Sequence, residues 1–398
     1  MEPIPFPFPN SPSLYHPAPE LADLRDKLPV AQVRLPDGKT AWAVTRNADV
    51  RQVLIDPRFS RARAADPDAP QTELSGLVNR SMLGMDPPEH TRLRKLVASA
   101  FTARRVEALR PRVIALVDEL IDAMERQGRP VDLVESFSLP MPVQVICELL
   151  GVPAEDRNLF HGWSDTTMGD WRENPEEKQA ALYALAGYFG GLIAAKRAAP
   201  ADDLMTALIA ARDEGDTLSE EELVTLCLGL LIGGHETTAN QINMMLLTLL
   251  AHPDELDRLR ADLDAIPVAI EELMRFVLLG AGSGASAPRI TTDAVTLSGV
   301  TIPAGAAVLP VLATANRDPE VFPDPDRLDL TRTASQHVGF GAGVHHCLGA
   351  QLARMELQEG LRGLLRRMPE LRVVVPDAEL RFKPGMVLRS LESLPVTW

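Results

Sequence analysis

One cysteine of this chain stands among residues whose types and spacing suit metal binding. Cys347 lies in the stretch FGAGVHHCLG, residues 340–349, which combines an aromatic ring, three glycines and two histidines with the thiol. Glycines let a backbone turn tightly and come close to a ligand. Residues 350–368 have the apolar spacing of an amphipathic helix, so Cys347 is expected at the N-terminus of that helix. There the helix dipole and the backbone N–H groups stabilise a thiolate, the form of cysteine that binds metals.

The other two cysteines have a simpler interpretation. Cys147 and Cys227 lie in the apolar runs 143–150 and 223–232. Cysteine is one of the most buried residue types, so both are predicted to be core residues, and the same alternative applies to Cys347 when it is considered alone. Three cysteines without paired spacing predict a reducing compartment and no disulfide framework.

A second stretch places glycines, an acid and hydroxyls inside a long apolar helix. Within the predicted helix 219–250, residues 231–238 read LIGGHETT. Each glycine costs a helix about 1 kcal/mol relative to alanine, so Gly233 and Gly234 indicate a place where a ligand approaches the backbone or the hydrogen-bond ladder opens. Glu236 and Thr237 follow directly. The alternative is a flexible point in a core helix with a solvated acid.

Two pairs of charged residues share a helix face. Glu272 and Arg275 are three residues apart on one predicted helix, and His90 and Arg94 are four apart on another. An exposed ion pair contributes little to stability, and a single His or Arg is most often a solvated surface group. These residues therefore indicate a site only in combination with other motifs.

The elements that position these residues are mostly helices. A β-hairpin is predicted at 30–35 and 41–45, around the turn signal Pro36-Asp37-Gly38. Helical periodicity predicts helices over residues 48–55, 91–100, 102–127, 142–150, 153–163, 176–197, 202–213, 219–250, 255–264 and 268–279. Short strands are expected at residues 294–297, 300–302, 307–312 and 371–375, with two more near the C-terminus. Residues 1–20 form a proline-rich arm, and residues 64–84 resemble a lid-like loop.

Composition excludes several classes of protein. The 398 residues include 55 Asp and Glu against 40 Lys and Arg, a formal net charge of −15, which argues against a nucleic-acid-binding protein. No uncharged apolar run of membrane-spanning length is present, and the N-terminus MEPIPFPFPN lacks the features of a signal peptide. We therefore expect a cytoplasmic protein without a membrane anchor. With 45% hydrophobic residues and no linker, the chain is expected to form one large body.

Together these stretches resemble the motifs of the cytochromes P450. Residues 340–349 resemble the haem-thiolate signature Phe-x-x-Gly-x-Arg/His-x-Cys-x-Gly, and residues 231–238 resemble the oxygen-binding motif Ala/Gly-Gly-x-Asp/Glu-Thr-Thr. Glu272 and Arg275 match Glu-x-x-Arg. The resemblance covers nearly the whole chain and is greatest to soluble bacterial members that tailor macrolides. It implies the P450 fold, mainly α with small β-sheets, as one large domain over residues 1–398, with haem b (iron protoporphyrin IX) as cofactor.

The resemblance also implies roles on the thiolate side of the haem. Cys347 would be the axial iron ligand, and a thiolate there favours O–O cleavage. The implied cofactor-binding residues around it are Phe340, Gly341, His345 and Gly349, where many members have Arg in place of His345. His90, Arg94 and Arg289 would bind the haem propionates together with His345.

On the oxygen side, the resemblance implies that Gly233 and Gly234 make room for dioxygen. Thr237 would hydrogen-bond the distal oxygen and Glu236 would relay protons from solvent. The family more often has Ala at the position of Gly233. The pair of Glu272 and Arg275 would bind Arg332 and hold the segment that presents the Cys347 loop, which is a structural role.

By the same resemblance, the substrate pocket would be lined by residues 64–84, 165–173, 233–237, 279–287 and the turn near Met386 and Val387. Few charges and many small residues in these segments predict a bulky, mostly apolar substrate. Electrons would come from a ferredoxin and its reductase, steered to a basic region made of Arg92, Arg94, Lys95, Arg104, Arg105, Arg110 and Arg112. The family default is a monomer.

The predicted function is therefore a haem-thiolate monooxygenase that hydroxylates or epoxidises a macrolide- or polyketide-type secondary metabolite with O2 and two electrons. One alternative keeps the haem but couples two carbons, or carbon and oxygen, in an aromatic or cyclic-dipeptide product. Another is a haem sensor or carrier. The sensor fits poorly, because a sensor has no need for the pair of Glu236 and Thr237.

Overall fold

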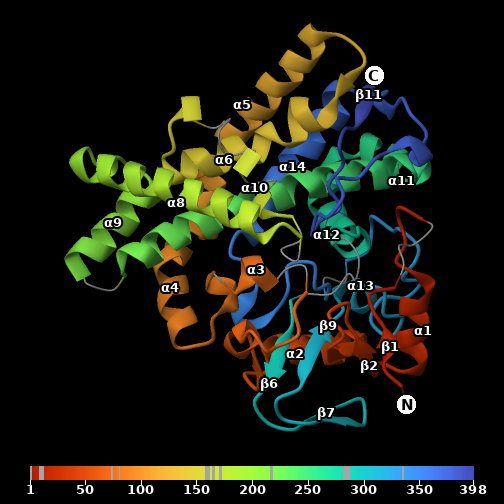
Figure 1. The fold of residues 1–398 in the computed structure, drawn as a ribbon. Helices are drawn as coiled ribbons and strands as arrows, with labels where there is room; N and C mark the ends of the chain where they lie inside the picture. Colours follow the sequence, from red (N-terminus) through yellow and green to blue (C-terminus); the bar gives the residue numbers. More distant parts are fainter. Residues whose placement is uncertain are drawn as a thin grey trace. The chain divides into compact units, whose positions relative to one another are not determined.

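The computed structural model describes residues 2–8, 13–72, 75–79, 81–156, 162–163, 166–169, 173–215, 218–280, 287–333 and 336–398 (Figure 1). The chain divides into two compact units. Unit 1 contains Met1–Pro87 and Ala251–Cys347, and unit 2 contains Pro88–Leu250 and Leu348–Trp398. Because each unit combines two separate stretches of sequence, neither is a contiguous segment of the chain.

Unit 1 is built on a six-stranded sheet with the order β1-β2-β3-β9-β6-β4. The strands are β1 (Ile4–Pro5), β2 (Val30–Arg34), β3 (Thr40–Val44), β4 (Phe59–Ser60), β6 (Arg289–Thr291) and β9 (Ala307–Pro310). The predicted hairpin is confirmed, since β2 and β3 pair antiparallel with Val30 opposite Val44, and Gly38 has a φ of 82° in the turn. A separate hairpin of β7 (Val295–Leu297) and β8 (Val300–Ile302) is also as predicted.

The helices of unit 1 are α1 (Pro19–Lys27), α2 (Asn47–Ile55), α3 (Ser75–Val78), α11 (Pro253–Ala261), α12 (Ile266–Phe276) and α13 (Leu312–Ala315). The proline-rich arm joins the sheet, because β1 pairs parallel with β2. The predicted loop 64–84 is less irregular than expected: α3 and the 3₁₀ turns Ala62–Ala65 and Met82–Gly84 interrupt it. The predicted strand 307–312 is too long, since α13 begins at Leu312.

Unit 2 is helical and surrounds α10 (Glu220–Leu250), which packs against α6, α8 and α14 (Figure 1). The other helices described in unit 2 are α4 (Glu89–Ala98), α5 (Ala103–Gln127), α6 (Pro140–Leu150), α8 (Pro175–Ala198), α9 (Leu204–Gly215) and α14 (Ala350–Arg367). Residues 238–249 of α10 are all buried, as expected for a helix that is apolar on every side. Cys147 and Cys227 are buried, as predicted, and burial raises the pKa of the Cys227 thiol to about 12.

A small sheet of unit 2 has the order β10-β11-β5 and joins β5 (Val131–Asp132) to β10 (Arg372–Val373) and β11 (Pro395–Thr397). The predicted helix 153–163 begins as a 3₁₀ turn, Ala154–Asp156, and then lies partly outside the described residues. Within the described residues, no helix has both the length and the apolar character needed to cross a membrane.

Candidate active site

The Cys347 loop is a compact turn closed by backbone hydrogen bonds. Cys347 N donates to Phe340 O at 2.9 Å, and Gly341 N donates to Val338 O at 2.8 Å. Gly341 and Gly343 have φ values of 69° and 70°, which favour glycine. A Cβ atom on Gly343 would also lie 2.6 Å from Leu54 O at the end of α2. The two glycines therefore let the loop fold against α2 while the Cys347 side chain stays exposed.

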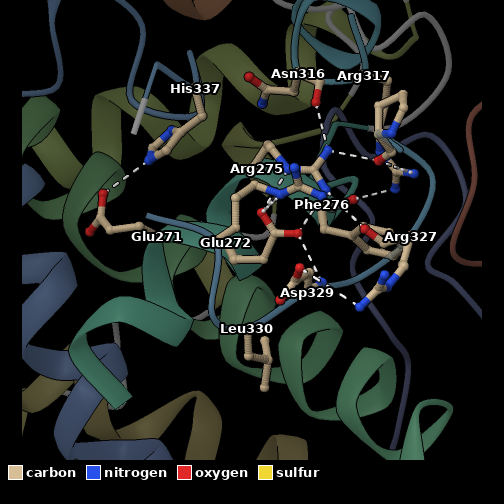
Figure 2. Close-up of polar contacts among 12 residues, drawn as sticks. Glu271, Glu272, Arg275, Phe276, Asn316, Arg317, Arg327, Asp329, Leu330 and His337 are labelled. Carbon is tan, nitrogen blue, oxygen red and sulfur yellow. Dashed lines mark hydrogen bonds and ion pairs between the residues drawn. The ribbon is translucent and has the colours of Figure 1, made fainter. Parts of the chain in front are cut away.

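A buried ion pair on α12 anchors the segment that leads to this loop (Figure 2). Glu272 and Arg275 have side chains only 1% exposed and form two parallel hydrogen bonds of 2.7 and 2.8 Å. Arg332 Nε lies 3.1 Å from Glu272 Oε2, which confirms the predicted partner. Arg275 also donates to Asn316 O and Pro325 O at 2.8 Å each. This network fixes residues 316–332 against α12.

Two polar side chains that the motifs did not predict fix the residues just before the loop (Figure 2). His337 Nε2 lies 3.0 Å from Glu271 Oε2, and His337 Nδ1 accepts a hydrogen bond from Gly339 N at 3.1 Å. Asn316 Oδ1 accepts from Val338 N at 2.7 Å. Because Nδ1 is an acceptor, the proton of a neutral His337 ring is on Nε2 and points to Glu271. A histidine close before the glycine-rich stretch was the available signal in the sequence.

Arg289 belongs to a cluster of buried charges in unit 1. Arg289 Nη1 donates to Val53 O at 2.5 Å, whereas Nη2 is buried without a hydrogen bond to any described residue. Burial, and then the charge of Arg61, lower the pKa of Arg289 to about 9. Burial also lowers the pKa of Arg61 to about 10. The nearby Asp86 carboxylate accepts from Ser60 Oγ and Arg61 N at 2.5 and 2.8 Å.

This Arg289 cluster, Arg61, Asp86 and Arg289, therefore has two buried guanidinium groups near one carboxylate. A buried donor without a hydrogen-bond partner is unfavourable, and Nη2 of Arg289 is such a donor among the described residues. The donor geometry of arginine suits a carboxylate partner. Arg61 was not predicted from the sequence, because an arginine in a polar loop gives no sign of its burial.

In unit 2, helix α10 is open on one side at its middle. Gly233 is exposed and Thr237 half-buried, although the following residues 238–249 are all buried. A Cβ atom on Gly233 would meet nothing within 4 Å. Thr237 Oγ1 donates to Gly233 O at 2.8 Å, so its lone pairs are directed to accept a further hydrogen bond. Glu236 beside it is buried, and its Oε2 lies 3.4 Å from Asn240 Nδ2.

Gly234, the neighbour of Gly233, lies at a close contact between two helices. A Cβ atom at this position would lie 2.8 Å from Cγ1 of Ile146 on α6. Gly234 therefore allows α10 and α6 to pack closely, and the opening on α10 depends on Gly233 and Thr237.

Comparisons with known proteins agree with this geometry. Residues 192–369 match the family model described as Cytochrome P450. The chain is 48% identical over 376 residues to mycinamicin IV hydroxylase/epoxidase of Micromonospora griseorubida, covering 94% of each protein. It is 48% identical over 381 residues to nocardicin C N-oxygenase of Nocardia uniformis subsp. tsuyamanensis, covering 96% of this chain and 95% of that protein. The crystal structure of HinD with NMFT and NO has a TM-score of 0.94 and 46% identity over the full length of both chains. The chain belongs to the cytochrome P450 family.

This P450 is a monooxygenase whose cofactor is a haem iron, and its own residues fit that group. The Cys347 loop presents an exposed thiol on a rigid turn, which suits an axial thiolate ligand. In the Arg289 cluster, Nη2 of Arg289 is buried without a hydrogen bond to any described residue, and such a donor suits a haem carboxylate.

The structure places the remaining predicted haem-binding residues of the P450 as follows. His90 on α4 is buried and Arg94, one turn later, is half-buried. Phe340 is buried, and His345 and Gly349 are half-buried. Glu356 on α14 is a further buried acid that no motif indicated: both carboxylate oxygens lack a hydrogen bond to any described residue, and burial raises the pKa well above its ordinary value.

Two of the predicted pocket segments of the P450 lie side by side in unit 2. Gly169 and Met386 form an antiparallel bridge, and Val387 N donates to Met168 O at 3.2 Å. A Cβ atom on Gly385 would lie 2.9 Å from Glu173 Oε2. Residues 281–286, most of another predicted segment, lie outside the described residues.

The predicted basic region is partly neutralised by acids of the same unit. Arg92 is paired with Glu222, and this hydrogen bond lowers the pKa of Glu222. Arg110 is paired with Glu107 and Glu359, and Arg112 with Glu148 and Glu119. Lys95, Arg104 and Arg105 are exposed.

Proposed function

We propose that this P450 hydroxylates or epoxidises a bulky, mostly apolar secondary metabolite of the macrolide or polyketide type. The opening of α10 at Gly233 and Thr237, beside the buried Glu236, is the observation that carries the proposal. A protein that only carried or sensed haem would not need a hydroxyl and an acid at an opening in a core helix. Bound through the Cys347 thiolate, haem b would supply the activation of dioxygen.

Each residue of the opening has one proposed task. The Thr237 hydroxyl, already donating to Gly233 O, accepts a hydrogen bond from the oxygen that is to be protonated. Glu236 carries the proton that this step consumes. The missing side chain of Gly233 leaves space for the reacting molecules. His90, Arg94, Arg289 and His345 would hold the haem propionates.

Similarity to mycinamicin IV hydroxylase/epoxidase supports the substrate class. Nocardicin C N-oxygenase, which is also 48% identical to this chain, is named for a different reaction. Relatives at this level of identity therefore differ in the reactions for which they are named. The side-by-side segments around Gly169 and Met386 would form one wall of the pocket. We further propose a monomer with one P450 domain over residues 1–398, located in the cytoplasm and reduced by a ferredoxin and its reductase.

A spin-state titration of the ferric protein against macrolides, polyenes, aromatic polyketides and cyclic dipeptides tests this function. We expect a tight shift of the Soret band towards high spin with a macrolide, and a product that has gained one oxygen atom on turnover. A shift with aromatics or cyclic dipeptides only, with a coupled product that has gained no oxygen, would contradict the proposal and favour oxidative coupling.

A further inference from the structure

His235 and Glu236, neighbours on α10, form a buried pair next to the opening of the helix. The exposed fractions of their side chains are 0% and 4%, and His235 Nε2 lies 3.4 Å from Glu236 Oε1. This distance is in the range of an ion pair and is longer than a good hydrogen bond. His235 Nε2 has no hydrogen bond to any described residue.

The other ring nitrogen of His235 determines where its proton lies. His235 Nδ1 is 2.8 Å from Leu231 O, one turn earlier on α10. A carbonyl oxygen can only accept, so Nδ1 carries a hydrogen. A neutral His235 ring therefore has its lone pair on Nε2, directed at the side where Glu236 Oε1 lies.

This arrangement favours a proton between Nε2 and the carboxylate oxygen. A neutral His235 beside an ionised Glu236 would place two lone pairs 3.4 Å apart. One proton between the two atoms removes this repulsion, because a protonated carboxyl group can donate to the Nε2 lone pair. At its other oxygen, Glu236 is near Asn240 Nδ2, which limits its rotation.

We propose that His235 is the positioning residue of Glu236. The two side chains share one proton, and His235 holds the carboxyl group so that this proton is available for transfer towards Thr237. The inference rests on the proposed function, in which Glu236 carries the proton. The proton balance is simple. Glu236 gives up one proton, the pair becomes a neutral imidazole and a carboxylate, and one proton from solvent restores it.

The shared proton can be observed without turnover. In protein labelled with ¹⁵N-histidine, studied in the diamagnetic ferrous carbonyl form, His235→Gln or His235→Asn identifies the His235 signals. We expect the Nε2 resonance of His235 to show hydrogen bonding or protonation in the wild-type protein and to shift to a free lone pair in Glu236→Gln. An Nε2 resonance that is the same in both proteins would overturn the proposal.

Kinetics then separate this inference from the proposed function. We expect His235→Gln and His235→Leu to lower product formed per electron pair about tenfold, below the loss typical for removing an acid–base group, and to change the solvent isotope effect. Thr248→Val is the matched control, because it removes a buried hydrogen bond to the residue four earlier on the same helix. If Glu236→Gln reduces coupling and the His235 variants do not, only this inference fails. If Glu236→Gln has no effect, the proposed role of Glu236 fails.

Discussion

At the scale of single residues, the Thr237 hydroxyl is held in one orientation by Gly233 O. Thr237→Ala removes the only lone pairs that this side chain offers to a reacting oxygen. We expect electron consumption to continue while product per electron pair falls about tenfold. The reason is that the oxygen to be protonated loses the hydroxyl that accepts its hydrogen bond. Measuring product formed against electrons consumed checks this. Thr237→Ser keeps the hydroxyl and should stay close to wild type, and full coupling in Thr237→Ala would contradict the role of this residue.

Glu356 is expected to make stability depend on pH. Burial raises its pKa well above the ordinary 4.5, so above pH 4.5 the folded chain keeps a proton that the unfolded chain loses. The free energy of unfolding therefore falls as pH rises above about 4.5, by up to about 1.4 kcal/mol per pH unit, until the pH reaches the pKa of Glu356 in the folded protein.

Glu356→Gln, which cannot ionise, should remove that slope. In urea unfolding, we expect the variant to gain stability over wild type at pH 7 and little at pH 4. The control is Glu107→Gln: this exposed acid has its pKa lowered by a hydrogen bond from Arg110, so its loss should not stabilise the protein at pH 7. Parallel curves for Glu356→Gln and wild type would mean that Glu356 is ionised in the folded protein.

At the scale of elements, the two glycines of α10 should respond in opposite ways to the same substitution. A Cβ atom has open space at Gly233, so Gly233→Ala should stabilise the protein by about 1 kcal/mol through helix propensity. At Gly234 it would meet Ile146 at 2.8 Å, so Gly234→Ala should destabilise by about 1–3 kcal/mol through overpacking. Urea unfolding of both variants measures the difference, and equal effects would show that α10 and α6 are less tightly packed than described.

The buried ion pair of α12 should contribute far more to the free energy of unfolding than the exposed ion pair of α11. Glu272→Gln leaves the buried Arg275 and the half-buried Arg332 without their carboxylate, so we expect a loss of about 3–5 kcal/mol in the free energy of unfolding. Asp257→Asn breaks a pair with Arg260 of the same spacing, in which Asp257 is 74% exposed. That loss should be within about 0.5 kcal/mol. Similar losses would show that Glu272 is not buried as described.

Periodicity in the sequence predicted α5, α8, α10 and α14 within two residues at each end, because apolar spacing depends only on local sequence. It could not show that β3 pairs with β9, which joins residues 42–44 to 308–310. The strand predicted to reach residue 312 ends at Pro310, because Ala315 N bonds to Val311 O and begins a helical turn.

Within the site, the motifs predicted the residues that act through type and spacing, such as Cys347 and the partner Arg332. They could not predict Arg61, Glu356 or His337, whose importance comes from burial and from contacts with distant segments. They also gave no sign of the close contact between Gly234 and Ile146, because this contact depends on how α6 packs against α10.

At the scale of the whole molecule, charge limits how an electron donor can approach. The chain carries a formal charge of −15, so the proposed donor, an acidic ferredoxin, would be repelled at long range. Attraction must come from the local cations, but Arg92, Arg110 and Arg112 are already paired with acids. The exposed Lys95, Arg104 and Arg105 remain for direct contacts.

The long-range repulsion and the local attraction together predict that the rate of reduction depends only weakly on salt. Between about 0.01 and 0.1 M ionic strength the Debye length falls from about 30 to about 10 Å, which screens the long-range repulsion and the local attraction together. We expect the rate of reduction by an acidic ferredoxin to change less than about tenfold, well below the strongest electrostatic steering. Stopped-flow reduction across this range of ionic strength measures the change in rate.

Arg104→Gln with Arg105→Gln should slow reduction at every ionic strength, whereas Arg34→Gln, at an exposed position of the β2 strand, should not. A rate that falls a hundredfold with salt would mean that the basic region dominates over the net charge, and that the intramolecular pairs of Arg92, Arg110 and Arg112 open when the donor binds.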